Sequence, residues 1–347
     1  MLGRFRVDRA TVRGLEVLAG RKAGEGMKLY ARRGHVKRHV LVRDWLGLAA
    51  MRGIAALLER IPLAWAHAFA RAAARLYMGL GSRRVRWTHR NLAVAFPSWS
   101  AADRASVAFE SCVNFALALL DLRRSEKWDE GQLLARFAFE GVEHLEAALS
   151  SGHGAVMLSL HMGCYDLGLR ALSLRFPSLR FAVISTPQRS ALLQGWLSDR
   201  RNAGVVEVIP PGSTSALRAL RVVRSGRPLI LLNDLYVRSG RKVEAPLFGK
   251  RCLTSTGPAV LARMAPASIL PCYVLRDGPD HYIAHILPKL ELPSGAVAAD
   301  DENITAECNG ALEDIIRKHP EHWIWAHRRF RYSPDLPSGL YRPLDSA

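Results

Sequence analysis

The sequence predicts an α/β fold, in which a layered, mostly parallel sheet is flanked by helices and preceded by a helical, amphipathic N-terminal extension. Two observations predict it. Apolar residues recur with helical spacing from about residue 43 to 125. After about residue 138, short apolar or β-branched runs alternate with helix-like stretches, as in strands joined by crossover helices. A chain of 347 residues without internal repeats or low-complexity linkers can bury one large core.

The first part of the chain, residues 1–40, is strongly basic, with eleven Lys and Arg against three Asp and Glu. A charge run of this kind is most often a solvated tail, and it also suits an arm that lies against an anionic membrane. No apolar core follows the basic start, so we predict no signal peptide.

The most apolar segment is 45–80, and charged residues interrupt it. These are Arg52, Glu59, Arg60, Arg71 and Arg75. No charge-free run of about 18 residues remains, which disfavours a membrane span. We expect amphipathic helices that either lie in a bilayer interface or pack as ordinary core helices. Pro62 should break the first helical stretch, and Ser100 with Asp103 predicts a capping box that begins a long helix.

The core is predicted from alternating strand and helix patterns. The expected strands lie within 154–160, 180–186, 205–210, 227–234, 268–277 and 281–288. The expected helices lie within 164–176, 190–204, 214–226 and 256–265. We therefore divide the chain into a basic arm over 1–40, a helical membrane-associating region over 41–125, an α/β core over 126–335 and a tail over 336–347.

The composition excludes several classes of protein. Hydrophobic residues make up 49% and the mean hydropathy is +0.01, too low for a polytopic membrane protein. The net charge of +18 predicts an anionic partner, which could be nucleic acid, a membrane or an acidic carrier protein. The five cysteines form no CxxC pair or Cys/His ladder, so we expect neither a structural metal site nor a disulfide framework. The GxSxG, HExxH, Walker and complete GxGxxG motifs are absent as well.

A histidine follows one predicted strand and an aspartate follows the histidine. His161 comes directly after 154–160, and Asp166 falls in the first turn of the next predicted helix. There the carboxylate can accept a hydrogen bond from one imidazole nitrogen, which leaves the other basic at the carboxyl edge of the sheet. Such a pair can act as a general base on a hydroxyl, although a core histidine satisfied by a nearby acid fits the bare pattern as well. Cys164 between them is interpreted as a small packing residue.

Polar and basic residues gather in three further segments. They are Arg200 and Arg201 at the end of a predicted helix, Asn233 and Asp234 at the end of a predicted strand, and Trp323, Trp325, His327, Arg328, Arg329 and Arg331 near the C-terminus. After the second segment we expect a basic loop and a small-residue turn into a helix. Aromatics mixed with arginines suit a lipid headgroup boundary, a phosphate or a nucleic acid, whereas each arginine alone also fits a surface ion pair.

Four blocks of the sequence, in order, resemble a known family. They are SRRVRWTHRNLAVAFPSWS, LSLHMGCYDLG, EAPLFGKRCLTSTGPAVLARMAPASILPCYVLR and PEHWIWAHRRFR. They are similar to the basic-HRNL, HxxxxD/E and later blocks of the bacterial lipid A biosynthesis (late, or secondary) acyltransferases, within the wider lysophospholipid acyltransferase superfamily. The resemblance runs from about residue 80 to 331, and its last two blocks are more specific than HxxxxD alone.

The resemblance implies an O-acyltransferase that uses no cofactor and no metal. His161 would be the general base that deprotonates an acceptor hydroxyl, and Asp166 would be its partner. The oxygen nucleophile would attack an acyl thioester on acyl carrier protein or coenzyme A, without a covalent acyl-enzyme. Arg201, or its neighbour Arg200, would correspond to the family's arginine after the catalytic block, and Asp234 to its later aspartate, so that both bind substrate.

The expected partners follow from the resemblance and the charge. Arg328 and Arg329 would meet a phosphate of donor or acceptor, which we infer from charge alone. We expect acyl carrier protein or a CoA thioester, an anionic membrane and a phosphorylated glycolipid as partners, and no nucleic acid. The expected acceptor is a lipid A precursor, with another lipid or lysolipid as the alternative. The expected location is the cytoplasmic face of the bacterial inner membrane, as a peripheral, monotopic or single-pass protein. A remote alternative is a non-catalytic basic protein that binds membrane surfaces or nucleic acid.

Overall fold

The computed structural model describes most of the chain after residue 61. The described ranges are 62–185, 206–210, 212, 214–236, 240–292 and 301–341, together with two short strands in the predicted basic arm. These strands, β1 (Arg4–Phe5) and β2 (Val36–Lys37), pair antiparallel. The rest of the arm, residues 41–61 of the helical region and the helix expected within 190–204 lie outside the described residues.

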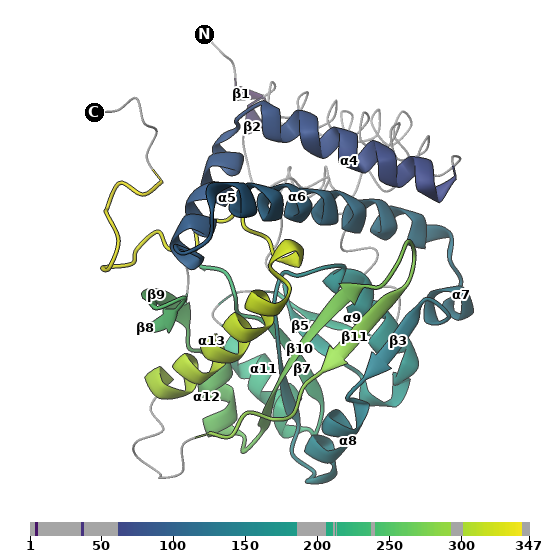
Figure 1. Ribbon diagram of the computed structural model, residues 1–347. Coiled ribbons are helices and arrows are strands. Elements are labelled where there is room, and N and C mark those ends of the chain that lie inside the picture. The colour runs from purple at the N-terminus through teal and green to yellow at the C-terminus, as the bar shows by residue number, and fades with distance from the viewer. Residues whose placement is uncertain are drawn as a thin grey trace.

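A seven-stranded sheet forms the centre of the molecule (Figure 1). In spatial order its strands are β3 (Phe137–Glu140), β11 (Tyr282–Ile286), β10 (Ser268–Arg276), β4 (Ala155–Ser159), β7 (Pro228–Leu232), β5 (Ala182–Ile184) and β6 (Glu207–Ile209). The five strands from β10 to β6 run parallel to one another. Strand β11 is antiparallel to β10, and β3 runs parallel to β11. The predicted mostly parallel sheet is confirmed, and it places the carboxyl ends of β4 and β7 side by side.

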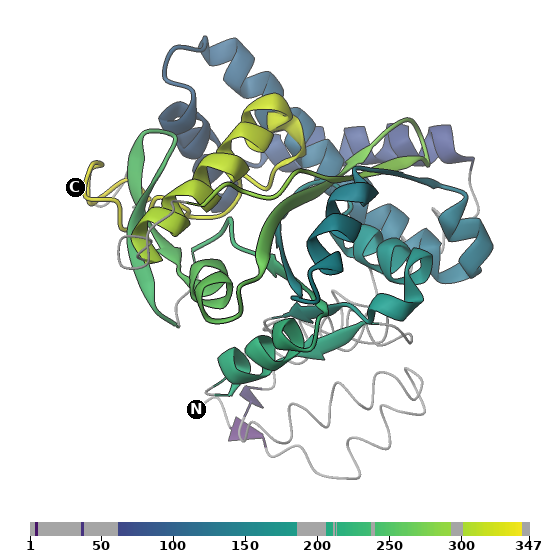
Figure 2. The same ribbon diagram turned by 90° about the horizontal axis from the view of Figure 1, so that it is seen from below.

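Helices cover both faces of this sheet (Figure 2). They are α8 (Val142–Ser150), α9 (Tyr165–Arg175), α11 (Ser215–Arg224), α12 (Gly257–Met264) and α13 (Asp301–Lys318). All five residues of β4 are buried, as a central parallel strand requires. Val156 and Leu158 pack with α11, α12 and α13, whereas Ala155 and Met157 pack with α8 and α9. Shorter helical elements are η1 (Ser125–Lys127), α7 (Glu130–Leu134), η2 (Pro177–Leu179) and η3 (Pro320–His322).

A hairpin follows the basic loop that we expected after Asp234. Its strands are β8 (Lys242–Leu247) and β9 (Lys250–Ser255), which pair antiparallel. The turn is possible because Phe248 and Gly249 both adopt positive φ, 52° and 67°, as two-residue hairpin turns require. Every second residue of β8 is buried, an alternation that the basic residues around it obscured in the sequence. The described residues between Asp234 and β8 belong to no helix or strand, as expected of the loop, whereas the hairpin after them was not predicted.

Three helices form a layer above the sheet in Figure 1: α4 (Leu63–Gly79), α5 (Arg83–Ala95) and α6 (Ala101–Arg124). Pro62 precedes α4, and the Ser100 hydroxyl caps α6 as predicted, by accepting a hydrogen bond from the Asp103 nitrogen at 3.1 Å. Small side chains let α4 approach α6 closely. The contact joins Ala66, Ala70 and Ala74 of α4 to Val113, Leu117 and Leu120 of α6.

Large apolar side chains on α4 point away from this contact. Trp65, Phe69, Leu76, Tyr77 and Leu80 are all exposed. By length and composition, one helix among the described residues could cross a membrane, and it spans 101–127. Core helices of soluble proteins have the same length and composition, and 39% of its most apolar window is buried. The choice between an interfacial and a core role for the helical region stays a prediction.

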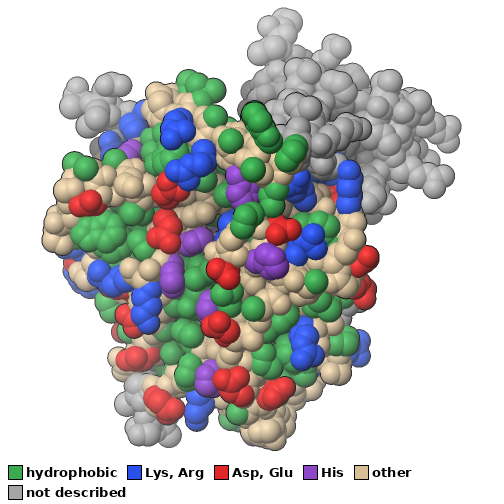
Figure 3. Space-filling model, turned by 45° about the vertical axis from the view of Figure 1, so that its right-hand side comes forward, with side chains coloured by type: hydrophobic (Ala, Val, Ile, Leu, Met, Phe, Trp, Pro, Cys, Tyr) green, Lys and Arg blue, Asp and Glu red, His purple; other side chains and the backbone are tan. Residues whose placement is uncertain are grey.

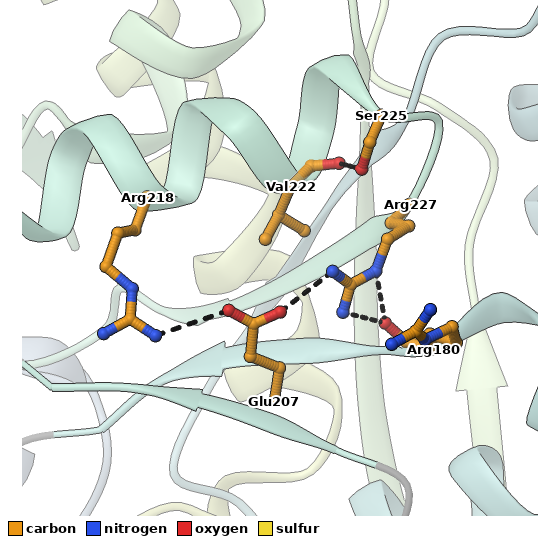
Figure 4. Close-up of polar contacts among 6 residues, drawn as sticks. All are labelled: Arg180, Glu207, Arg218, Val222, Ser225 and Arg227. Atoms are coloured by element: carbon orange, nitrogen blue, oxygen red, sulfur yellow. Dashed lines mark hydrogen bonds and ion pairs between the residues drawn. The ribbon is translucent and has the colours of Figure 1, made fainter.

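At the side of the sheet where β6 is the last strand, an ion-pair network joins β6 to α11 (Figure 4). Glu207 accepts hydrogen bonds from Arg227 at 2.8 Å and from Arg218 at 3.4 Å. The Arg227 guanidinium also donates to the backbone oxygen of Arg180. The hydrogen bond from Arg227 is the main reason why the pKa of Glu207 is lowered. These contacts are peripheral and fix the last two strands of the sheet.

Candidate functional site

The segment after β4 turns sharply at the carboxyl edge of the sheet. Gly163 adopts a φ of +55°, and a Cβ there would lie 2.0 Å from the backbone oxygen of Val274 on β10. Only glycine fits this close approach. The turn leaves His161 at the carboxyl end of β4 and starts α9 directly afterwards.

A second segment, 319–331, packs against this turn and pairs with it. Met162 and Trp323 form an isolated antiparallel bridge. The Gly163 nitrogen donates to the backbone oxygen of His322 at 3.1 Å, and the Ile324 nitrogen donates to that of His161 at 3.2 Å. The C-terminal block that stood out in the sequence is therefore part of the site.

A buried carboxylate holds the His161 imidazole. Asp234 Oδ1 lies 2.8 Å from His161 Nδ1, and Oδ2 accepts hydrogen bonds from the His161 nitrogen at 2.9 Å and from Trp323 Nε1 at 2.8 Å. Burial opposes ionisation of Asp234, but the neighbouring imidazole and these hydrogen bonds outweigh it and lower the pKa of the carboxyl. The carboxylate therefore carries its charge against Nδ1, and Nε2 is the basic nitrogen of the ring.

This arrangement gives Asp234 a contact with His161 that the sequence did not predict. We expected Asp166 to hold an imidazole nitrogen and Asp234 to bind substrate, but the structure gives the Nδ1 contact to Asp234. The contact forms because β7 lies beside β4 in the sheet. The Asn233 nitrogen extends the pairing of the two strands by donating to the Ser159 oxygen at 3.1 Å, which brings Asp234 next to His161. Asp166 does lie in the first turn of α9, and its role as a partner of His161 stays a prediction.

His161 opens onto a cavity of about 440 Å³. Its polar lining includes Asp166, Ser185, Tyr236, Tyr273, His285 and His327. Its apolar lining includes Leu169, Leu172, Val183, Ile184, Ile230, Leu232 and Leu235. A smaller hollow of about 50 Å³ lies between the turn and α6, and His161, Tyr165 and Asp166 line both. On the face shown in Figure 3, histidines gather towards the centre among acidic and hydrophobic side chains.

His327 is a cavity residue that our sequence reasoning did not assign to the site. Burial lowers the pKa of its imidazole to about 4, and the positive charges of Arg328 and Arg329 act in the same direction. The ring is therefore neutral near pH 7 and can donate a hydrogen bond without carrying a charge. The only signal in the sequence was its place in the block 320–331.

The two predicted arginines that the structure describes, Arg328 and Arg329, are not among the residues that line the cavity. Arg329 is buried and donates to the Leu253 oxygen at 2.8 Å and to Thr254 Oγ1 at 2.6 Å, so it faces β9 and not a substrate phosphate. The Arg328 guanidinium lies 4.9 Å from the centre of the Trp87 ring, away from the cavity lining. Arg200 and Arg201 lie outside the described residues.

Cys164 is buried, as its interpretation as a packing residue requires. Burial raises the pKa of its thiol to about 12, so it stays protonated and is a poor nucleophile. Within the described ranges, no group of three or more His, Cys, Asp or Glu side chains is placed to hold a metal ion.

An imidazole held by a buried carboxylate, at the carboxyl edge of an α/β sheet and above a partly apolar cavity, has the geometry with which histidine-base enzymes activate a hydroxyl group. Comparison with known proteins identifies which of them this chain resembles. It belongs to the bacterial lipid A biosynthesis acyltransferases, whose family model matches residues 32–332. It is therefore an acyltransferase.

Three relatives show the range of the similarity. The lipid A biosynthesis lauroyltransferase of Escherichia coli (strain K12) is 24% identical over 301 residues, which cover 85% of this chain and 93% of the relative. The lipid A biosynthesis palmitoleoyltransferase of the same strain is 25% identical over 262 residues, 75% of this chain and 82% of the relative. A phosphatidylinositol mannoside acyltransferase of Mycobacterium tuberculosis is 31% identical over 187 residues, 53% of this chain and 56% of the relative.

Proposed function

We propose that this protein transfers a fatty acyl chain from an acyl thioester to a hydroxyl of a phosphorylated glycolipid, with a lipid A precursor as the acceptor. The observation that carries the proposal is the contact between His161 and Asp234 at the mouth of the partly apolar cavity. Family membership supports the reaction class, and the two Escherichia coli relatives support the acceptor.

The first step is proton removal. His161 Nε2 takes the proton of the acceptor hydroxyl while Asp234 stabilises the imidazolium through Nδ1. Trp323 fixes the carboxylate from its other oxygen, so the ring keeps one orientation. Asp166, on the same cavity wall, adds negative charge beside the imidazolium.

The second step is attack on the thioester. The acceptor oxygen bonds to the carbonyl carbon, whose oxygen becomes negatively charged in the tetrahedral intermediate. We assign His327 as a neutral hydrogen-bond donor to this oxyanion, because it lines the same cavity as His161. The C–S bond then breaks, and the imidazolium of His161 returns its proton to the thiolate. The products are an ester and a thiol, with no covalent enzyme intermediate and no cofactor.

The acyl chain lies in the apolar part of the cavity, between α9 and the ends of β5 and β7. Leu169 and Leu172 supply the wall from α9, and Val183 and Ile230 supply the floor. The carrier, acyl carrier protein or coenzyme A, remains outside with only its thioester in the cavity. The exposed apolar side chains of α4 support a position at the cytoplasmic face of the inner membrane, where the acceptor is embedded.

The test uses purified wild-type protein and the His161→Ala and Asp280→Ala variants. Asp280 is a partly exposed acid that pairs with Arg136, so it controls for the loss of a side chain outside the cavity. Each is incubated with a tetra-acylated lipid A precursor and labelled acyl-carrier protein or acyl-CoA, and products are identified by mass spectrometry. Ester formation by wild type and Asp280→Ala, lost in His161→Ala with folding intact, supports the proposal. Transfer that survives in His161→Ala would overturn the role of the base.

A second acceptor class is favoured by one observation, the 31% identity to a phosphatidylinositol mannoside acyltransferase. The same assay with a mannosylated inositol phospholipid in place of the lipid A precursor tests it. Transfer to that acceptor alone would keep the reaction class and exclude lipid A as the product.

A further inference from the structure

Asn91 lies on α5, far along the chain from the site, and its side chain is buried. Its Nδ2 donates two hydrogen bonds, to the backbone oxygens of Trp325 and His327, both at 2.6 Å. Its Oδ1 accepts a hydrogen bond from the Tyr341 hydroxyl. One side chain thus joins α5 to three points that lie 234 to 250 positions away.

These contacts leave the amide a single orientation. Carbonyl oxygens only accept hydrogen bonds, so the NH2 group must face them, and the Tyr341 hydroxyl donates to Oδ1 on the other side. That hydroxyl also accepts a hydrogen bond from the Phe330 nitrogen at 3.1 Å. A buried network in which every donor has an acceptor is rigid, whereas an unpaired buried polar group destabilises the folded protein.

The network holds the backbone from which His327 projects into the cavity. The two carbonyls that Asn91 binds lie on either side of Ala326. The His327 side chain is less firmly held than its backbone, because its buried Nδ1 has no hydrogen-bond partner within the part of the chain that the structure describes. The direction of the ring therefore depends on the backbone, which Asn91 holds together with the turn bond from the Arg329 nitrogen to the His327 oxygen at 2.9 Å.

We propose that Asn91 is a positioning residue for acyl transfer, which holds the His327 imidazole at the thioester carbonyl by binding the backbone on both sides of Ala326. The inference rests on the proposed function, in which His327 donates to the oxyanion. It assigns a role in acyl transfer to the HRNL block of the sequence, whose asparagine is Asn91. No residue of this block is among those that line the cavity.

A purely structural role is the competing explanation, and the chain offers a matched control. Asn114 on α6 makes the same type of bond to the same segment, since its Nδ2 donates to the Glu321 oxygen at 2.9 Å. That carbonyl lies six positions before His327. If Asn91 only stabilises the segment, Asn91→Ala and Asn114→Ala should resemble each other in their kinetics.

The experiment is a double-mutant cycle on the full chain, with kcat and KM for the acyl donor measured for wild type, Asn91→Ala, His327→Ala and the double variant. We expect His327→Ala to lower kcat roughly 100-fold, the effect of removing one oxyanion donor. Asn91→Ala should lower kcat at least about tenfold with little change in KM, because a small misplacement of a catalytic group acts on the transition state. In the His327→Ala background Asn91→Ala should have almost no further effect. Asn114→Ala should retain the wild-type kcat.

Tyr341→Phe provides a second, milder variant in case Asn91→Ala does not fold. It removes the hydroxyl that orients the amide and should lower kcat a few-fold, again only when His327 is present. Equal losses from Asn91→Ala with and without His327, or a wild-type kcat in a folded Asn91→Ala, would overturn the proposal. Absence of transfer by the wild type on every acceptor would instead overturn the proposed function, and this role with it.

Discussion

The carboxyl edge of the sheet and the helical layer of α4 and α6 differ in which side chains they bury and which they expose. At the edge, the buried Asp234 carboxylate is paired with His161 and accepts three hydrogen bonds in the interior. In the helical layer, aromatic and aliphatic side chains such as Trp65 are exposed. The difference teaches that the sheet edge compensates buried polar groups with hydrogen bonds, whereas α4 leaves apolar surface uncovered.

Asp234→Asn should have the largest effect, because it removes the charge that orients and stabilises the imidazole while keeping the side-chain shape. We expect kcat to fall roughly 10⁴-fold, as in other histidine bases that lose their carboxylate. The measurement is steady-state acyl transfer near pH 7. Asp280→Asn, at a partly exposed acid, should remain close to wild type. A fall in kcat of less than tenfold in Asp234→Asn would show that acyl transfer at the carboxyl edge does not depend on the buried charge of Asp234.

Replacing both Trp65 and Phe69 by Ser tests the helical layer. Burying one large apolar side chain in a bilayer interface contributes about 1.5–3 kcal/mol to membrane binding. We therefore expect the affinity of the double variant for anionic phospholipid vesicles to fall about 100-fold. Cosedimentation measures this, and transfer to a detergent-dispersed acceptor should change little. Leu217→Ser with Met264→Ser replaces exposed apolar residues on α11 and α12 and should bind vesicles like wild type. Equal binding by both double variants would contradict a membrane role for α4.

The partly buried, neutral His327 should make the protein acid-sensitive. Its pKa of about 4 in the folded protein lies below the ordinary 6.5, so the unfolded chain binds the extra proton first. The stability from a neutral His327 is therefore present above pH 6.5 and is lost as the pH falls towards 4, by about 3 kcal/mol. Denaturant unfolding of wild type and His327→Gln measures it. The variant should lose less stability in that window, and parallel curves would refute the burial of a neutral ring.

Trp323→Phe should have the smallest effect, because it removes one of the three hydrogen bonds to Asp234 and keeps the aromatic packing. We expect kcat to fall roughly tenfold. Trp325→Phe is the matched control, since its Nε1 donates to the Pro320 oxygen at 2.7 Å instead. Similar kcat values for the two variants would mean that Trp323 only fills space.

Much of the architecture can be predicted from local pattern. The apolar run at 154–160 and the period of 164–176 correctly predicted β4 and α9, because burial on both faces and an apolar helix face leave direct marks in the sequence. The β8–β9 hairpin could not be predicted in the same way, since its alternation is short and basic residues interrupt it. The tail from 336 contains Tyr341, whose bond to Asn91 has no local signal.

The sequence by itself determined the class of fold, the position of His161 after a buried strand and the resemblance to an acyltransferase family. Only the tertiary structure decided which carboxylate holds the imidazole, that Arg329 faces the core, and that Asn91 and His327 belong together. The physical reason is that strand and helix patterns are local, whereas a hydrogen bond between residues 73 or 236 positions apart depends on which strands and helices become neighbours.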